Sequence, residues 1–308
     1  MIAILLTAMC QSADSDYKVY VEGETARIDD KDKCVDMRGN LLSGKAELQK
    51  PLKDGGTFGT LCIDGEKNGV SRGYYKSGAL SAEMEQKGGK IVSVRLYYES
   101  GGLKIESNAN EDRGYYESGA LQYVKSSKND KLEGVAKAFY ENGNLEQETP
   151  FKNGVKDGIS KRYYESGKLK SEAPFKNGVG DGITKIYYED GAFQYIMPQK
   201  NGKLEGVAKV FYDSGKLKEE IPYKNGIENG IGKFYYEDGN LKQELAWKNG
   251  VVEGKTKAFR KNSKIFGVFT YKNNKAISGI CHKTNGEKRP FTEAELDNWN
   301  NDLSVTCD

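Results

Sequence analysis

The sequence predicts an all-β protein, an elongated single-layer antiparallel meander of tandem 24-residue β-hairpin repeats with a short C-terminal capping helix. Three observations predict this fold. An aromatic pair followed by a turn glycine recurs at fixed spacing, and a Lys-Asn-Gly turn recurs between these copies. The third is composition: only 37% of the 308 residues are apolar, below the roughly 45–50% usual in compact soluble domains. A large compact core is therefore excluded.

The repeat is visible in the motif Tyr-Tyr-Glu-Ser-Gly and its close variants. Its glycine returns every 24 residues from Gly119 to Gly239, and earlier copies place it at Gly78 and Gly101. The Lys-Asn-Gly motif begins at residues 152, 176, 200, 224 and 248. A longer period lies on top, because the segment at 131–137 returns unchanged at 203–209, 72 residues later. Such self-similarity indicates a tandem array containing a duplicated three-repeat block.

Each unit predicts a β-hairpin, with strands at 159–164 and 169–175 and a glycine turn between them. With a loop of two or four residues, Tyr164 lies opposite Leu169 and Lys161 opposite Glu172. The same Lys–Glu facing is expected at Lys137/Glu148, Lys209/Glu220 and Lys233/Glu244. Because side chains alternate along a strand, we expect an inner, concave face with Tyr164, Leu169, Ala173 and Phe175. The other face, expected to be solvated, carries Tyr163, Lys161, Lys170 and Glu172.

The two ends of the chain depart from the repeat, which divides it into four parts. Residues 1–10 form a signal-like segment, 11–66 an N-terminal cap with degenerate repeats, 67–290 the hairpin array and 291–308 a C-terminal helical cap. Thr292 with Glu295 fits a capping box, and Phe291 with Leu296 fits a hydrophobic staple. We therefore expect a helix at about 293–303, with Leu296, Trp299 and Leu303 on one face.

Five cysteines stand outside the regular array, at Cys10, Cys34, Cys62, Cys281 and Cys307. With Cys10 set aside, two lie near each end. The pairing Cys34–Cys62 and Cys281–Cys307 is one of three connectivities, and it would fasten each cap. Four buried thiols are the alternative.

The first ten residues give a prediction of location. Met1 to Met9 is an apolar stretch directly followed by Cys10. This resembles a bacterial lipoprotein signal, in which the cysteine becomes the lipidated first residue after cleavage. The resemblance implies export and a lipid anchor at Cys10, which places the protein in the cell envelope. A cytoplasmic location is the alternative.

The residues that most enzymes need are missing from the sequence. His282 is the only histidine, no Cys-X-X-Cys pair exists, and the recurring glycines lie in turns and not in a phosphate-binding loop. We therefore predict that the protein is not an enzyme and binds neither a metal nor a cofactor. A net charge of +2 also argues against a nucleic-acid partner.

The tyrosines are the remaining candidate site. The second aromatic of each pair is always tyrosine, whereas the first is sometimes phenylalanine, so we expect the second hydroxyl to make hydrogen bonds. Either it bonds a neighbouring turn and holds the ladder together, or the residues form an aromatic track that receives an extended partner. The eight residues are Tyr75, Tyr98, Tyr116, Tyr140, Tyr164, Tyr188, Tyr212 and Tyr236.

The recurring pattern resembles the MORN repeat variant, found in bacterial proteins known as YwqK-type antitoxins. The resemblance spans roughly residues 64–288 and is clearest for 114–258. It implies a hairpin array used for protein or membrane contacts, with no catalytic residues. We expect a scaffold that binds a protein or an envelope component, with membrane contact only through the lipid anchor. Alternatives are a cytoplasmic antitoxin that neutralises a toxin by binding it, and a carbohydrate- or membrane-surface-binding module.

Overall fold

The computed structural model describes residues 18–20, 26–28, 31, 33–36, 38–301 and 305–307. The signal-like segment, Cys10 and Leu303 lie outside these residues. Contacts divide the chain into two units, Met1–Val155 and Lys156–Asp308, and each is described by itself. Among the described residues, no helix combines the length and the apolar character that a membrane span requires.

In the first unit, strands follow one another as antiparallel neighbours from β4 onward, β1 pairs with β4, and β2 and β3 form a separate small sheet. The strands of this unit are β1 (Lys18–Tyr20), β2 (Ala26–Ile28), β3 (Cys34–Asp36), β4 (Lys45–Pro51), β5 (Thr57–Ile63), β6 (Glu66–Lys67), β7 (Gly69–Tyr74), β8 (Leu80–Lys87), β9 (Lys90–Tyr97), β10 (Leu103–Asn108), β11 (Glu111–Tyr115), β12 (Leu121–Lys128), β13 (Lys131–Leu132), β14 (Gly134–Phe139) and β15 (Leu145–Lys152), with β16 (Val155–Lys156) at its end.

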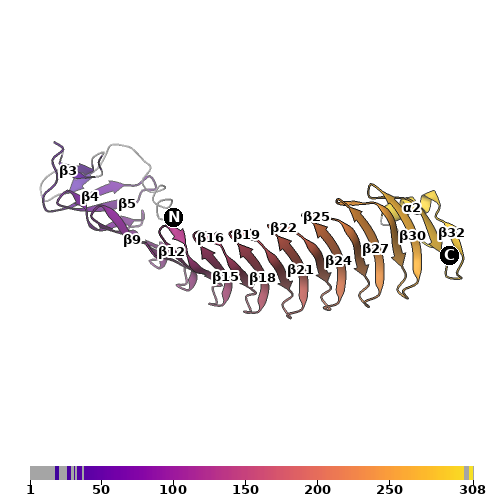
Figure 1. The fold of residues 1–308 in the computed structure, drawn as a ribbon. Helices are drawn as coiled ribbons and strands as arrows, with labels where there is room; N and C mark the ends of the chain where they lie inside the picture. The colour runs from indigo at the N-terminus through magenta and orange to yellow at the C-terminus, as the bar shows by residue number, and fades with distance from the viewer. Residues whose placement is uncertain are drawn as a thin grey trace. The chain divides into compact units, whose positions relative to one another are not determined.

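The second unit continues the same pattern and ends in a helix (Figure 1). Its elements are β17 (Gly158–Tyr163), β18 (Leu169–Lys176), β19 (Val179–Gly180), β20 (Gly182–Tyr187), β21 (Phe193–Lys200), β22 (Lys203–Leu204), β23 (Gly206–Phe211), β24 (Leu217–Lys224), β25 (Ile227–Glu228), β26 (Gly230–Tyr235), β27 (Leu241–Lys248), β28 (Val251–Val252), β29 (Gly254–Phe259), β30 (Ile265–Lys272), β31 (Lys275–His282), β32 (Lys288–Pro290) and α2 (Glu293–Asn300). The predicted all-β antiparallel meander of hairpins with a C-terminal helix is confirmed.

The hairpin loop corrects the predicted register at one point. The backbone N–H of Tyr164 donates to the carbonyl of Lys168, so the loop has three residues and closes with Gly167 at positive φ. Tyr163, and not Tyr164, therefore lies opposite Leu169. The prediction failed because it considered only loops of two or four residues.

Beyond the loop, the predicted register holds. Lys161 lies opposite Glu172, and the same facing is found at each of the other three predicted Lys–Glu pairs. A bulge between Arg162 and Tyr163 shifts the pairing by one residue. Across this bulge Leu169 lies on the same face as Tyr163, Lys161 and Glu172. The Nζ of Lys170 lies over the ring of Tyr164, 5.2 Å from its centre. The predicted faces of Leu169 and Lys170 were therefore exchanged.

We name the two faces of the sheet by their residues in this hairpin. The small-residue face carries Ser160, Ala173 and Phe175, and the charged face carries Lys161 and Glu172. The equivalent residues of the other repeats lie on the same faces, because the register recurs from copy to copy. The sheet is a single layer, so in the described repeats no second sheet covers either face.

The Lys-Asn-Gly end of each repeat combines a tight turn with a second bulge. Asn177 and Gly178 both have positive φ, as a two-residue hairpin turn requires. The turn leads into the short strand β19, which the sequence did not predict, and then into Gly182 at φ 125°. A Cβ atom at Gly182 would lie 2.6 Å from Pro174. Glycine is therefore required at this bulge for both conformation and space.

The C-terminal cap forms as the capping signals predict. The side chain of Thr292 accepts from the backbone N–H of Glu295, and the Glu295 carboxylate accepts from that of Thr292. Phe291 is buried in a cluster against which Leu296 and Trp299 pack. The helix ends at Asn300, earlier than predicted, and the cap residue Asn301 donates from both its backbone N–H and its side chain to the Asp297 carbonyl.

The pH dependence of this cap follows from Glu295. A bidentate bond from Arg289 and the capping bond hold the pKa of Glu295 at about 2, below its ordinary value of 4.5. A depressed pKa contributes stability that is present above about pH 4.5 and is lost as the pH falls toward 2. In Trp247→Phe protein, Trp299 emission should therefore shift to the red over this window. Glu295→Gln should shift it already at neutral pH, and an unchanged spectrum in that variant would contradict the assignment.

Candidate binding surface

The second tyrosine of each pair ties its own repeat to the next one. The hydroxyl of Tyr164 donates to the backbone carbonyl of Tyr187 at 2.7 Å, one repeat further along the chain. Tyr140 occupies the same loop position, with the same backbone bonding. Equivalent hydroxyl bonds join Tyr75 to Tyr97, Tyr98 to Tyr115, Tyr116 to Phe139, Tyr188 to Phe211, Tyr212 to Tyr235 and Tyr236 to Phe259.

Two further contacts link successive repeats at opposite ends of the strands. In the tyrosine loop, Ser166 Oγ donates to the carboxylate of Glu189 at 2.7 Å. At the Lys-Asn-Gly turn, the backbone N–H of Asn177 donates to the carboxylate of Asp157. These polar contacts hold both margins of the sheet, so the hydroxyls of the second tyrosines serve the structure. Their role in binding a partner stays a prediction.

The small-residue face carries an aromatic row that the sequence prediction missed. Its members stand directly before the Lys-Asn-Gly turns, and each lies opposite the bulge glycine of its hairpin. They are Phe151, Phe175, Tyr223, Trp247 and Tyr271. The signal was present in the sequence as an aromatic residue preceding lysine at 24-residue intervals, with Gln199 as the exception. All but Tyr271 keep part of their ring surface in contact with solvent.

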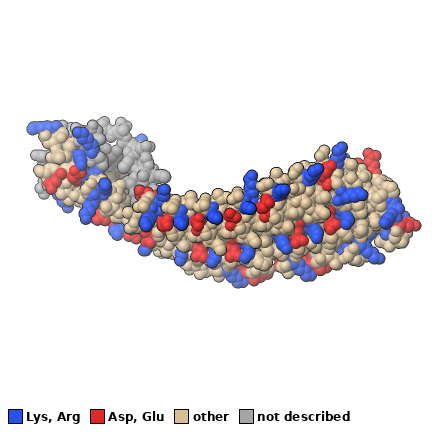
Figure 2. Space-filling view, viewed as in Figure 1, with Lys and Arg blue, Asp and Glu red and all other residues tan. Residues whose placement is uncertain are grey.

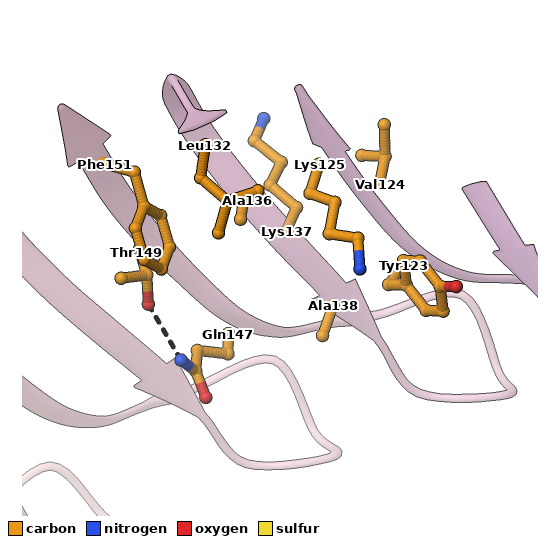
Figure 3. Close-up of a pocket in the computed structure, with 10 residues that line it drawn as sticks. All are labelled: Tyr123, Val124, Lys125, Leu132, Ala136, Lys137, Ala138, Gln147, Thr149 and Phe151. Carbon is orange, nitrogen blue, oxygen red and sulfur yellow. Dashed lines mark hydrogen bonds between the residues drawn. The ribbon is translucent and has the colours of Figure 1, made fainter. Parts of the chain in front are cut away.

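In the first unit, the small-residue face contains a hollow lined mainly by aromatic and small apolar side chains (Figure 3). It measures about 320 Å³ and lies between the rings of Tyr123 and Phe151, over the small side chains of Ala136 and Ala138. The floor is closed by buried Thr149, which accepts from Gln147 Nε2 at 2.8 Å. Burial, and secondarily the charge of Asp112, raises the pKa of Tyr123. The hollow thus offers apolar surface between two aromatic walls.

The charged face is internally neutralised. In the second unit, Glu172 stands opposite Lys161 in its own hairpin and Lys185 in the next one, whose Nζ lies 2.8 Å away. The hydroxyl of Tyr187 donates to the same carboxylate, and the bond from Lys185 is the main cause that lowers the pKa of Glu172. In the equivalent pair further along, burial together with the bond to Glu220 raises the pKa of Tyr235 to about 12. Figure 2 likewise shows both charge signs intermixed over the second unit.

This charge row is interrupted at the positions that the 72-residue period predicts. Val124 and Ile196 stand where the copies between and after them have glutamate, up to Glu244, and each lies between two basic residues. The aromatic residue fifteen positions later is then Phe139 or Phe211 in place of tyrosine. A tyrosine hydroxyl there would lack the carboxylate that accepts from Tyr187 and Tyr235. Phenylalanine is not confined to these copies, because Phe259 follows Glu244. Beside Ile196, the ring of Tyr187 stacks on Phe193, and Phe193 contacts the tilted ring of Phe211.

The charged face also carries a row of exposed aliphatic residues next to the charges. Ile159, Ile183 and Ile231 are 52%, 51% and 61% exposed. Ile159 lies opposite Pro174 and Ile183 opposite Pro198. Exposed apolar surface of this extent is a second candidate for contact with a partner.

The four cysteines within the described residues form two disulfides. Cys34 is bonded to Cys62 and Cys281 to Cys307, with Cα–Cα distances of 6.2 and 5.7 Å. All four are fully or almost fully buried. His282 lies at the end of β31, and burial followed by the charge of Lys288 lowers its pKa. The described part of the chain holds no cluster of three or more potential metal ligands.

Comparison with known proteins identifies the repeat. The family described as the MORN repeat variant matches residues 132–153, 156–177, 204–225 and 228–249, so these copies are MORN-type repeats. No curated protein matches the chain. Matching solved structures include TcdB2-TccC3, at 12% identity over 83% of this chain and 16% of that chain with a TM-score of 0.19. They also include a porin-like protein from Bacteroides uniformis, at 8% identity over 81% of this chain and 94% of that chain, with a TM-score of 0.15. The chain thus spans about a sixth of the length of TcdB2-TccC3.

The inter-repeat hydroxyl bonds lead to a stability prediction. Tyr164→Phe and Tyr188→Phe should each lower the free energy of unfolding by about 0.5–1.5 kcal/mol, because each leaves a backbone carbonyl without its donor. Urea unfolding measures the change. Tyr195→Phe, at a tyrosine that is 36% exposed, is the matched control and should change little. Equal effects at all three positions would contradict the assigned role.

Proposed function

We propose that the protein is a non-enzymatic scaffold that binds a protein or a cell-envelope component along its small-residue face. The observation that carries this proposal is the aromatic row of that face, whose rings stay partly exposed over a floor of small side chains. Aromatic residues beside apolar hollows are the usual anchors of protein interfaces. The second tyrosines line the far margin of this surface, as Tyr236 does beside Gln243 and Ala258.

The small-residue face is a better candidate than the charged face. On the charged face, the lysine, glutamate and tyrosine groups are paired with one another, so a partner would have to break existing bonds. On the small-residue face, Phe175 and Trp247 offer apolar ring surface that binding can bury without such a loss. The aliphatic row of the charged face nevertheless makes a useful experimental control.

Export and lipid anchoring at Cys10 complete the proposal. The two disulfides support export, because disulfides persist in oxidising compartments and are rare in the cytosol. The apolar stretch before Cys10 supports the anchor. The cytoplasmic antitoxin function of YwqK-type proteins is the second candidate, supported by the repeat type but not by the disulfides. A carbohydrate-binding module ranks below both, because only two tryptophans are present and Trp299 is stacked inside the C-terminal cap.

The binding face can be tested by site-specific photocrosslinking in the native host. A photoreactive phenylalanine analogue at Phe175 or Trp247 should trap a discrete partner, whereas the same analogue at Ile231, on the opposite face, should not. Mass spectrometry of the adducts identifies the partner. Crosslinking confined to Ile231 would instead assign binding to the charged face.

Location can be tested by intact-mass measurement after separating membrane from cytosol. We expect a membrane-fraction species that begins at Cys10 and carries added acyl mass, with four of its cysteines oxidised. An unprocessed and fully reduced chain in the cytosol would overturn export and favour the antitoxin function.

A further inference from the structure

The small-residue face already holds one helix, and it belongs to the chain itself. Helix α2 packs against the last strands of the second unit (Figure 1). The indole ring of Trp299 stacks on Phe269 with ring centres 4.3 Å apart. The indole N–H donates to the hydroxyl of Tyr271 at 2.7 Å. Tyr271 is the last member of the aromatic row, so α2 shows how this row receives a large aromatic side chain.

The surface on which α2 packs has a counterpart one repeat earlier, and no helix of the described residues packs on that counterpart. Phe269 and Tyr271 correspond to Leu245 and Trp247, which lie 24 residues earlier on the same face. Under α2, Phe269 is 0% and Tyr271 9% exposed, whereas Leu245 and Trp247 stay half-buried. Phe269 is covered by Trp299 of the helix and by Phe291 just before it, and Leu245 and Trp247 have no such cover within the described part of the chain.

The geometry of a sheet face favours a helix over an extended segment as occupant. On the small-residue face, the N–H and C=O groups of the strands are used in pairing with neighbouring strands. An extended segment laid across that face would bury its own backbone groups without partners, which is costly. A helix satisfies its backbone groups internally and presents only side chains to the face, as α2 does.

We propose that the uncovered part of the small-residue face in the second unit binds an amphipathic helix carrying a large aromatic residue, supplied by a partner protein. This inference rests on the proposed function. It assigns a helical partner in place of the extended partner that the sequence suggested. The chain's own α2 is not the occupant, because the Cys281–Cys307 disulfide fastens the segment after the helix to β31. The aromatic anchor of the partner sits over Leu245 beside Trp247, as Trp299 sits over Phe269 beside Tyr271.

The two tryptophans of the chain allow a direct test. In Trp299→Phe protein, Trp247 is the only tryptophan, and its emission, excited selectively over the tyrosines, reports on the open face. The probe is an 18-residue amphipathic peptide, held helical by lactam bridges, with a naphthyl side chain on its apolar face and no tryptophan. It should change Trp247 emission in a saturable manner. A second peptide with alanine in place of the naphthyl residue should bind at least about tenfold more weakly.

A second measurement does not require that the Trp299→Phe variant folds. Fluorescence anisotropy of the labelled probe with otherwise unaltered protein should show weaker binding after Trp247→Ala, again by about tenfold or more. Ile231→Ser on the charged face should leave the affinity unchanged. Equal affinities for both variants would overturn the assignment to this face.

The outcomes separate this inference from the proposed function. If a proline-containing, extended peptide of the same composition binds as tightly as the helical probe, the helical occupant is wrong while binding at this face stands. If no probe binds and photocrosslinking at Trp247 traps no partner, both proposals fail together.

Discussion

The hydrogen bond from the second tyrosine of one repeat to a backbone carbonyl of the next is the interaction on which the rest of this structure depends. A single-layer sheet has no opposing layer to bury its side chains, so stability comes from neighbouring strands. Backbone ladders alone leave the loops at each margin free to splay. The tyrosine bond, the Ser166–Glu189 contact and the Asp157 contact to the Asn177 turn fasten both margins. Side chains between the margins are thereby released from core packing and remain available on the two faces.

Local features could be predicted from the sequence, and features set by backbone irregularity could not. The hairpin strands, the Lys161–Glu172 facing and the Thr292 capping box each depend on residues close in the sequence or at a constant spacing. Leu169 and Lys170 lie on the opposite faces from those predicted because of a bulge. A bulge shifts the strand pairing by one residue and so moves the side chains beyond it to the other face. The candidate binding surface was therefore predicted only in part. The second tyrosines were found by their repetition, but the aromatic row before the turns was missed, because opposing bulge glycines bring it together on one face.

The paired substitutions at Ile196 and Phe211 show how far such repetition constrains individual residues. Glu172 and Glu220 each accept from the tyrosine fifteen residues later, Tyr187 and Tyr235; after Val124 and Ile196, phenylalanine avoids an unpaired hydroxyl. The pairing works in one direction only, because Glu244 is also followed by a phenylalanine, Phe259. At Val124 and Ile196 the charge row gives way to apolar surface, so the array is a sequence of three-repeat blocks and not a uniform ribbon.

The tyrosine bonds also give the array a direction. Each hydroxyl points to the following repeat, so a copy removed from the C-terminal end would leave a donor without an acceptor. The last position is therefore filled differently: Arg260 replaces the tyrosine and donates to the carbonyl of His282, while Phe266 replaces the lysine that lies over the tyrosine ring elsewhere. Repeats are added to such an array most readily by internal duplication, because blocks inserted between existing copies leave the specialised C-terminal contacts of Arg260 unchanged. The 72-residue duplication is growth of this kind, and it lengthens the small-residue face while both termini stay intact.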